Sequence, residues 1–448
     1  MCVAAAAGLA AALLPAAARA HASQQAVILL LDTTPAIVGA ALAVAATVLL
    51  GVWAGWVPRF RAWRLGSWPG TGTGLSWLGF GLLVFLLAVG QFGPHDPLGN
   101  LLPLTIWTVI WVAMTAAVAL LGDIWRPIAP WRGPVRLARR LLRRQGGVGL
   151  ARLGHWPAVA GLFAIAWYEL ISPAPSDPAG LARVAAFYWT LVFALAVLEG
   201  EDWLDRGEAL SLYFRLTAKI APLWRRDEGK RRALWIGVPG AQIVAMAPLT
   251  AAEVAFVTLL LATVSFDGLS ETFFWLGQVG VNPLNYPGRT ALIGVNSAGL
   301  LAAWALTAAL ILGALAASRR GRDPNTGRSP LLLGFLPIAT AYHVSHYLVT
   351  LLTRGQYVFT GLNDPFERGW SLLGINDDWA SFGFLSDPHD VMLIWSAQVA
   401  LIVVAHVLAV LLTLRLVPGG LRTHLPVGVL MVGYTIFGLW LLAAPSIG

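Results

Sequence analysis

The chain has 448 residues, of which 58% are hydrophobic and only 12% are charged, and its mean hydropathy is +0.71. An ordinary soluble domain carries about 25% charged residues, so this composition excludes one. The formal net charge of +8 does not indicate a nucleic-acid partner, because the basic residues occur in short segments between long apolar runs. We therefore expect an integral membrane protein.

The first 20 residues resemble a cleavable signal peptide, with an apolar run that ends in the small-x-small pattern Ala18-Arg19-Ala20. Cleavage there leaves His21 at the mature N-terminus, where its imidazole and the α-amino group form a weak candidate site for a metal. The single cysteine, Cys2, lies in the signal segment. Cysteine chemistry is thus excluded from the mature chain.

The rest of the chain, residues 21–448, is predicted to be one all-α membrane domain. A spanning helix needs about 20 mostly apolar residues, because hydrocarbon offers no hydrogen bonds to the backbone. Ten windows meet this requirement: Pro35–Trp56, Gly74–Phe92, Leu101–Gly122, Trp156–Ile171, Gly180–Leu198, Gln242–Ser265, Thr290–Ala317, Leu331–Thr353, Val391–Leu416 and Leu425–Ala443.

The distribution of Lys and Arg predicts the orientation in a bacterial inner membrane, since short basic loops stay in the cytoplasm. Alternate loops hold 25 Lys or Arg, and the opposite side holds four, namely Arg183, Arg289, Arg354 and Arg368. We therefore expect the mature N-terminus and the C-terminus on the periplasmic side.

Two cytoplasmic segments, 126–152 and 206–232, are strongly basic. Within them, Pro134–Gln145 and Glu208–Arg226 place apolar and basic residues at helical spacing. Such helices lie on membrane surfaces and bind anionic lipid headgroups. A docking site for a partner membrane subunit is the alternative.

Candidate chemistry lies in polar residues at membrane depth, which are costly there and often functional. The eighth window places His343, His346 and Tyr347 on one helix face, and the ninth places His406 at a similar depth. Glu253, in the sixth window, is predicted near the midplane as well.

Imidazoles with a carboxylate are ligands for zinc, manganese, cobalt or iron. We therefore expect a divalent transition metal on His343, His346 and His406, with Glu253 or Asp267 holding a ligand or accepting a proton. Hydrogen bonding to neighbouring helices, haem ligation and a proton relay remain open alternatives for these histidines.

The external loop 354–390 is long and acidic. Its residues Asp364 and Trp370 are candidates for a lid over an outward-facing cavity, because the loop is longer than a simple connection needs. A solvated acidic loop without such a role is the alternative.

Several long strings of this sequence resemble bacterial membrane proteins known as fenitrothion hydrolases or fenitrothion hydrolase-like proteins. They include GDIWRPIAPWR, EGEDWLDRGEALSLYFRLTAKIAPL, AYHVSHY and GQYVFTGLNDPFERGWSLLG. The resemblance implies a membrane-bound hydrolase of organophosphate aryl esters. Positions that match the family's pattern are His343, His346, Asp267, Asp364 and His406, whereas Leu414 stands where many relatives have a further histidine.

From these patterns the main hypothesis is a metal-dependent phosphotriester hydrolase. In it, a metal-bound hydroxide attacks a small apolar substrate that has partitioned into the lipid, with Glu253, Asp267 and Tyr347 as catalytic residues. The alternative is a transporter, or a membrane redox component that carries a metal or haem. A third possibility is a subunit whose partner holds the active site.

Overall fold

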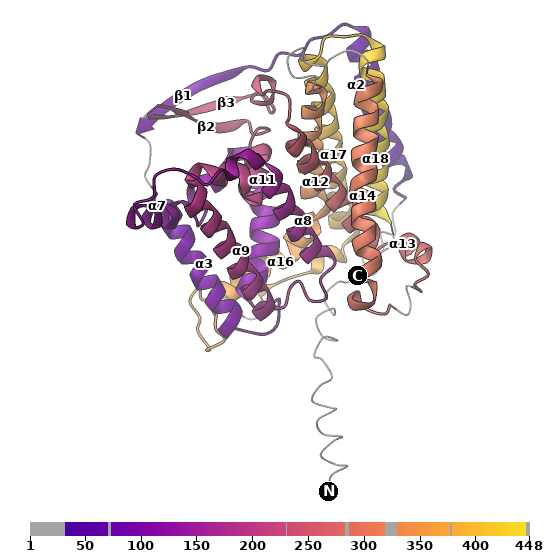
Figure 1. Ribbon diagram of the computed structural model, residues 1–448. Helices are drawn as coiled ribbons and strands as arrows, with labels where there is room; N and C mark the ends of the chain where they lie inside the picture. Colours follow the sequence, from indigo (N-terminus) through magenta and orange to yellow (C-terminus); the bar gives the residue numbers. More distant parts are fainter. Residues whose placement is uncertain are drawn as a thin grey trace.

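The computed structural model describes residues 32–69, 73–229, 231–282, 286–318, 329–376 and 379–444. The predicted signal peptide, Cys2 and His21 lie outside these residues, as does the basic loop from Arg319 to Arg328. Helices run roughly parallel to one another and form the body of the molecule (Figure 1). The prediction of an all-α, multi-pass membrane bundle is confirmed.

Eight helices of the described part are long and apolar enough to cross a membrane, or nine when one bent pair is included. One of the eight is continuous through α4 (Leu101–Leu104), a π-helix (Thr105–Ala113) and α5 (Met114–Leu121). The other seven are α2 (Thr34–Trp53), α3 (Gly74–Phe92), α9 (Pro178–Glu199), α12 (Ala251–Ser270), α14 (Arg289–Ala317), α17 (Pro388–Leu416) and α18 (Leu421–Ala443).

Two of the ten predicted spans are not single helices long enough to cross a membrane. α8 (Trp156–Leu170) has 15 residues, which is about 22 Å at the rise of an α-helix and shorter than a hydrocarbon core of about 30 Å. The eighth window is interrupted: α15 (Phe335–His346) and α16 (Leu348–Asn363) meet at a bend of 57°.

Shorter helices connect or cap these elements. They are α6 (Trp125–Ile128), α7 (Arg132–Leu141), α10 (Leu204–Gly207), α11 (Ala209–Thr217) and α13 (Phe273–Gln278), with 3-10 turns at Leu150–Leu153, Glu201–Trp203, Ile243–Ala245, Pro330–Gly334 and Gly383–Leu385.

A small antiparallel sheet at one end of the bundle was not predicted. Its strands are β1 (Ala62–Pro69), β2 (Leu223–Glu228) and β3 (Arg231–Gly237), in the order β1-β3-β2 (Figure 1). Gly229, between β2 and β3, has a φ of +64°, a conformation that glycine adopts without a steric penalty. The sheet therefore joins two basic loops that are far apart in the sequence.

The two segments predicted as surface helices have different outcomes. α7 is a helix whose Leu141 is 74% exposed, and its place on a membrane surface stays a prediction. The prediction for Glu208–Arg226 is wrong: α11 ends at Thr217, and β2 begins at Leu223. Leu212, Tyr213 and Phe214 are consecutive and all buried, so α11 has no polar face to turn toward water.

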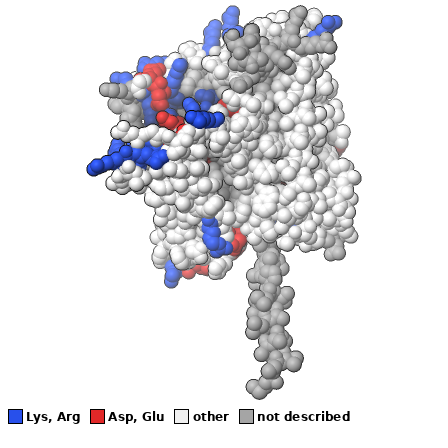
Figure 2. Space-filling model, in the orientation of Figure 1, with Lys and Arg blue, Asp and Glu red and all other residues white. Residues whose placement is uncertain are grey.

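Charged side chains gather at the two ends of the molecule, and a broad uncharged band separates them on the face shown in Figure 2. The larger group lies where Figure 1 places α7 and the sheet. Ion pairs tie these loops together, among them Arg64 with Glu228 (3.0 Å) and Arg126 with Asp227 (3.1 Å). Three of the basic loops that the sequence assigned to one side, 59–64, 126–152 and 206–232, therefore share one end in their described parts.

Close packing of α3 against the α6 loop gives a direct test of the fold. A Cβ on Gly79 would lie 1.8 Å from the carbonyl oxygen of Ile128, whereas one on Gly81 meets nothing within 4 Å. We expect Gly79→Ala to destabilise the protein by about 1–3 kcal/mol and Gly81→Ala to have little effect. Thermal unfolding followed by tryptophan fluorescence measures both, and equal midpoints for the two variants would contradict this packing.

Candidate functional site

The break between α15 and α16 lies beside a group of partly buried polar side chains. We call Glu169, Asp267, Glu271, Arg289, His346, Tyr347 and Arg354 the helix-break cluster. α15 ends at His346, and Tyr347 leaves helical geometry with φ −91° and ψ 11°. An interrupted helix exposes backbone groups that lipid cannot satisfy, and in membrane proteins such breaks occur where they are buried or line a cavity.

Two carboxylates from different helices meet the chain at this break. The imidazole Nε2 of His346 donates to Asp267 Oδ2 at 2.7 Å, and the hydroxyl of Tyr347 donates to Glu169 Oε1 at 3.2 Å. Asp267 lies near the end of α12, and Glu169 near the end of α8. The last residue of α15 and the residue that follows it are thus tied to two separate helices.

Two arginines border the cluster. Arg289, at the start of α14, donates to the carbonyl oxygen of Glu169 at 2.9 Å and lies 3.9 Å from the Glu271 carboxylate. Arg354, on α16, interacts electrostatically with the carboxylates of Glu271, Glu169 and Asp267. Three acids therefore face two permanent cations and one histidine.

The cluster is incompletely hydrogen-bonded among the described residues. Glu169 Oε2 and His346 Nδ1 are both buried and have no hydrogen-bond partner there. A buried carboxylate oxygen without a donor is costly. A proton or a bound cation would satisfy it, so this arrangement is chemically suited to exchange one or the other.

His343 and His406 make hydrogen bonds to backbone carbonyls instead. His343 Nε2 donates to the carbonyl of Trp111 at 2.7 Å, and His406 Nδ1 donates to the carbonyl of Ile402 at 2.8 Å. Trp111 belongs to the π-helix Thr105–Ala113, a rare geometry that is frequent at functional sites. His343 thus joins α15 to the π-helix, and His406 bonds within its own helix.

The described residues contain no group of three or more His, Cys, Asp or Glu side chains placed to hold a metal ion. His343, His346 and His406 therefore do not form the shared ligand set that their depths suggested, because each ring faces a different partner. The donor set of the described chain does not fit a divalent metal on these three residues.

Glu253 lies in a different place from the one predicted. α12 begins at Ala251, so Glu253 is in its first turn and forms a capping box with Thr250. Its carboxylate lies 3.4 Å from Arg215 and 3.8 Å from His155, and burial lowers the pKa of His155. Glu253 is therefore far along the helix from Asp267, by about 21 Å at the rise of an α-helix.

The acidic segment 354–390 is only partly a loop, because α16 continues to Asn363. The carboxylate of Asp364 accepts hydrogen bonds from the backbone of Arg368, Gly369 and Trp370, at distances between 2.6 and 3.0 Å. The Trp370 ring is 46% exposed and packs against Phe366. Asp364 thus organises its own turn, and its role as part of a lid stays a prediction.

The sequence reasoning missed Glu169, Arg289 and Arg354 as site residues. Glu169 could have been identified from the sequence, because it is a carboxylate inside an apolar window and such residues are functional candidates. The two arginines flank apolar windows, where cations are common. Nothing in their local sequence pointed to a shared cluster.

Comparison with known proteins gives one informative similarity. No model of a known protein family matches the chain, and no solved structure matches it. A relative from Pseudomonas aeruginosa (strain UCBPP-PA14), named "Probable potassium transport system protein Kup", is 24% identical over 336 residues, which cover 65% of this chain and 51% of that protein. The chain thus spans about half the length of the curated relative it matches.

This similarity overturns the predicted activity. The relative's name describes transport of potassium, and nothing in it concerns hydrolysis or organophosphates. The prediction of a phosphotriester hydrolase is therefore wrong, and the transporter alternative agrees better with the comparison. The resemblance to fenitrothion hydrolase-like proteins stays a prediction about sequence only.

The hydrogen bond from His346 to Asp267 should contribute to stability. Replacing the ring in His346→Leu leaves the Asp267 carboxylate short of a donor in a buried site, and we expect a loss of about 1–3 kcal/mol. His389→Leu is the matched control, because His389 is exposed at the start of α17. The midpoints of thermal unfolding in detergent measure both, and a shift of the same size in the control would count against the bond.

Proposed function

We propose that this chain is a membrane transporter of a small monovalent cation, and that potassium is the first cargo to test. The observation that carries the proposal is the interrupted helix at His346 and Tyr347, which bonds to the partly buried carboxylates of Glu169 and Asp267. The similarity to the potassium transport protein supports it independently.

The chemistry of a cation site favours this cluster. A cation that enters a bundle must exchange its water for oxygen ligands, which broken helices commonly supply from carboxylates and from freed backbone carbonyls. Glu169 Oε2 is buried and without a donor, and the Tyr347 hydroxyl lies 3.2 Å from the other oxygen of the same carboxylate. These two groups are the proposed ligands.

The arginines of the helix-break cluster would balance its charge. Arg289 lies near Glu271, which leaves Glu169 and Asp267 as the carboxylates that face the break. Asp267 is bonded to His346, so a change at either residue alters the charge next to the proposed site. The Asp267–His346 pair therefore gives the transporter a charge whose state can change when a cation binds.

We further propose that the basic end faces the cytoplasm of a bacterial inner membrane, following the asymmetry of Lys and Arg. α2 leads directly into β1, so Thr34 lies at the end away from the sheet. Leu412 of α17 lies close to Gly240, just after β3, so α18 starts at the sheet end and Ala443 lies at the other. Both described chain ends would then be periplasmic.

Uptake of radioactive rubidium, a potassium analogue, into liposomes that contain the purified protein tests the function. We expect Glu169→Gln and Asp267→Asn to slow uptake by roughly tenfold, since each removes a buried charge that the site depends on. Glu228→Gln is the control, because Glu228 pairs with Arg64 in the sheet, far from the break.

Two results would contradict the proposal. One is uptake by the wild-type protein no faster than by empty liposomes for potassium, rubidium and sodium. The other is uptake by both cluster variants at the wild-type rate, provided that size-exclusion chromatography shows that they are folded.

A further inference from the structure

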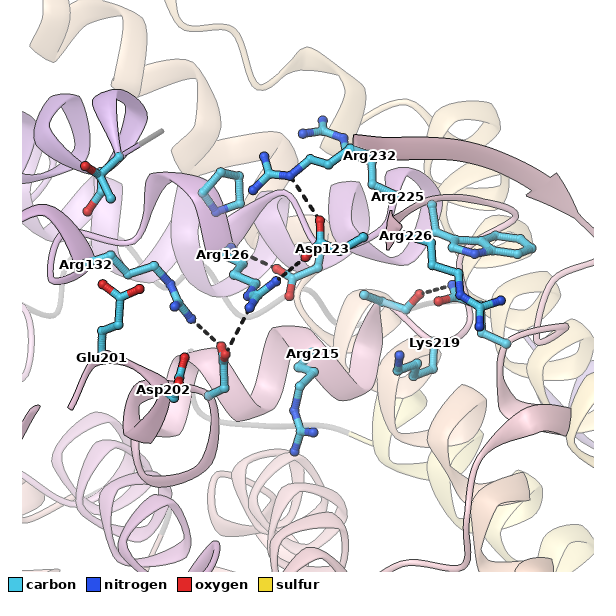
Figure 3. Close-up of a pocket in the computed structure, with 18 of the residues that line it drawn as sticks. Asp123, Arg126, Arg132, Glu201, Asp202, Arg215, Lys219, Arg225, Arg226 and Arg232 are labelled. Carbon is cyan, nitrogen blue, oxygen red and sulfur yellow. Dashed lines mark hydrogen bonds and ion pairs between the residues drawn. The ribbon is translucent and has the colours of Figure 1, made fainter. Parts of the chain in front are cut away.

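A polar pocket lies at the basic end of the molecule, well apart from the helix-break cluster. Its volume is about 510 Å³, which falls in the range of small-molecule sites. Side chains from the α6 and α7 region, from α11 and from β2 line it (Figure 3). Eight of these are Lys or Arg and five are Asp or Glu, so the pocket has an excess of positive charge.

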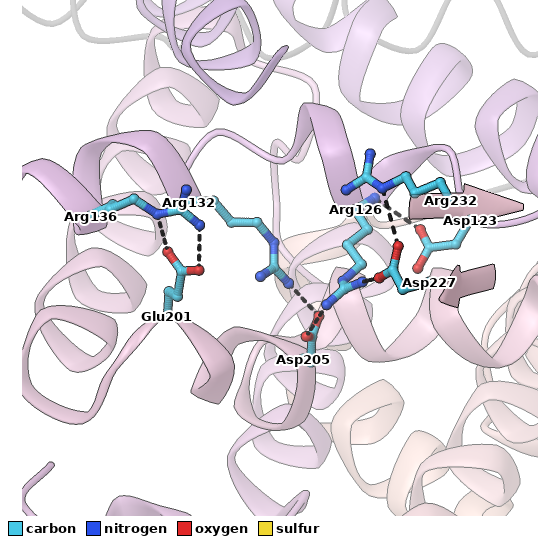
Figure 4. Close-up of polar contacts among 8 residues, drawn as sticks. All are labelled: Asp123, Arg126, Arg132, Arg136, Glu201, Asp205, Asp227 and Arg232. Carbon is cyan, nitrogen blue, oxygen red and sulfur yellow. Dashed lines mark hydrogen bonds and ion pairs between the residues drawn. The ribbon is translucent and has the colours of Figure 1, made fainter. Parts of the chain in front are cut away.

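One half of the pocket is neutralised by ion pairs. Asp205 binds both Arg126 and Arg132, Asp227 binds Arg126 and Arg232, and Glu201 binds Arg136 at 2.6 Å (Figure 4). The Arg136 guanidinium, through its hydrogen bond, holds the pKa of Glu201 below its usual range. These arginines are therefore committed to carboxylates of the same chain.

The other half has cations without such partners. Lys219, in the turn after α11, and Arg226, on β2, make no ion pair or side-chain hydrogen bond within the described residues. Figure 3 shows Lys219 and Arg226 on the same side of the pocket. Arg215 lies near them, and its buried Nε–H has no acceptor in the described chain.

These cations affect one another. Burial lowers the pKa of Lys219, and the nearby positive charges of Arg215 and Arg226 lower it further, while Asp123 opposes them. Burial also raises the pKa of Asp123, so this acid is poorly suited to neutralise the lysine. Positive charge is therefore concentrated in a partly buried space, where it acts on a ligand more strongly than on an open surface.

We propose that this half of the pocket binds a phosphate-bearing anion through Lys219 and Arg226. Arginine forks match phosphate oxygens, and a lysine ammonium adds a compact charge. The phosphate comes either from the headgroup of an anionic phospholipid or from a soluble compound. A bound anion would relieve the repulsion between Lys219 and Arg226 and would join the turn after α11 to β2.

The test uses the full chain in neutral detergent, with the midpoint of thermal unfolding as the readout, because a ligand that binds the folded state raises it. One arm adds inorganic pyrophosphate, with sodium chloride at equal ionic strength as the reference. The other arm adds short-chain phosphatidylglycerol, with the matching phosphatidylcholine as the reference. We expect a saturable rise in at least one arm.

The variant Lys219→Gln/Arg226→Gln should need a concentration of the anion roughly tenfold higher, or more, to give the same rise in the midpoint. Arg140→Gln/Arg143→Gln is the matched control: it removes two charges from the same end of the molecule at exposed positions that do not line the pocket, and it should respond like the wild type. Arg226→Gln alone, at an exposed strand position, provides a variant that should fold even if the double variant does not.

Each outcome decides a point. A response to pyrophosphate identifies a soluble phosphate, and a response to phosphatidylglycerol alone identifies a lipid headgroup. No rise in either arm overturns the proposal, as does an equal response in the wild type and in Arg226→Gln. Cation uptake is not measured, so this result does not depend on the transport proposal.

Discussion

In hydrocarbon, each polar group must find its partner within the protein, and this requirement shapes the centre of the molecule. Ser345 Oγ donates to the carbonyl of Gln398, and the Gln398 amide donates back to the carbonyl of Ser345, at 3.1 and 2.9 Å. This reciprocal pair fastens the end of α15 to α17. Nε2 of His343 bonds to a carbonyl of the π-helix, so the end of α15 is held on two sides before α16 begins.

The helix-break cluster follows from the same requirement. Once the helix is interrupted at Tyr347, the polar groups there need partners from α8 and α12, and Glu169 and Asp267 provide them. The opposite end of the molecule faces water, where charged side chains can be solvated. It has a sheet and many ion pairs, and Lys219 and Arg226 line one half of a pocket without an ion pair.

The helical bundle could be predicted because apolar runs of about 20 residues leave few other solutions in lipid. The asymmetry of Lys and Arg likewise placed the basic loops together. The sheet could not be predicted in this way, because three spanning helices, α3, α4–α5 and α9, lie between β1 and β3 in the chain, and their pairing is not visible locally. Neither proline nor glycine stands at the break at Tyr347, so local helix propensity did not indicate that the helix is interrupted there.

The site was only partly predictable. Spacing correctly put His343 and His346 in one helix, but helical spacing does not determine which neighbour each ring meets. Glu253 was placed too deep because the start of the helix was assigned nine residues early, and the cap at Thr250 sets the true start. Depth estimates depend on helix ends, and those ends are fixed by capping side chains rather than by hydropathy.

The sheet also limits how the molecule can move. β1 joins α2, which packs against α17 and α18, to α3, which packs against α7 and α9, while its pairing with β3 anchors it to the chain that enters α12. The sheet therefore connects the two helix groups at one rim of the bundle. Any rocking of one group against the other must pivot near that rim and open widest at the far edge.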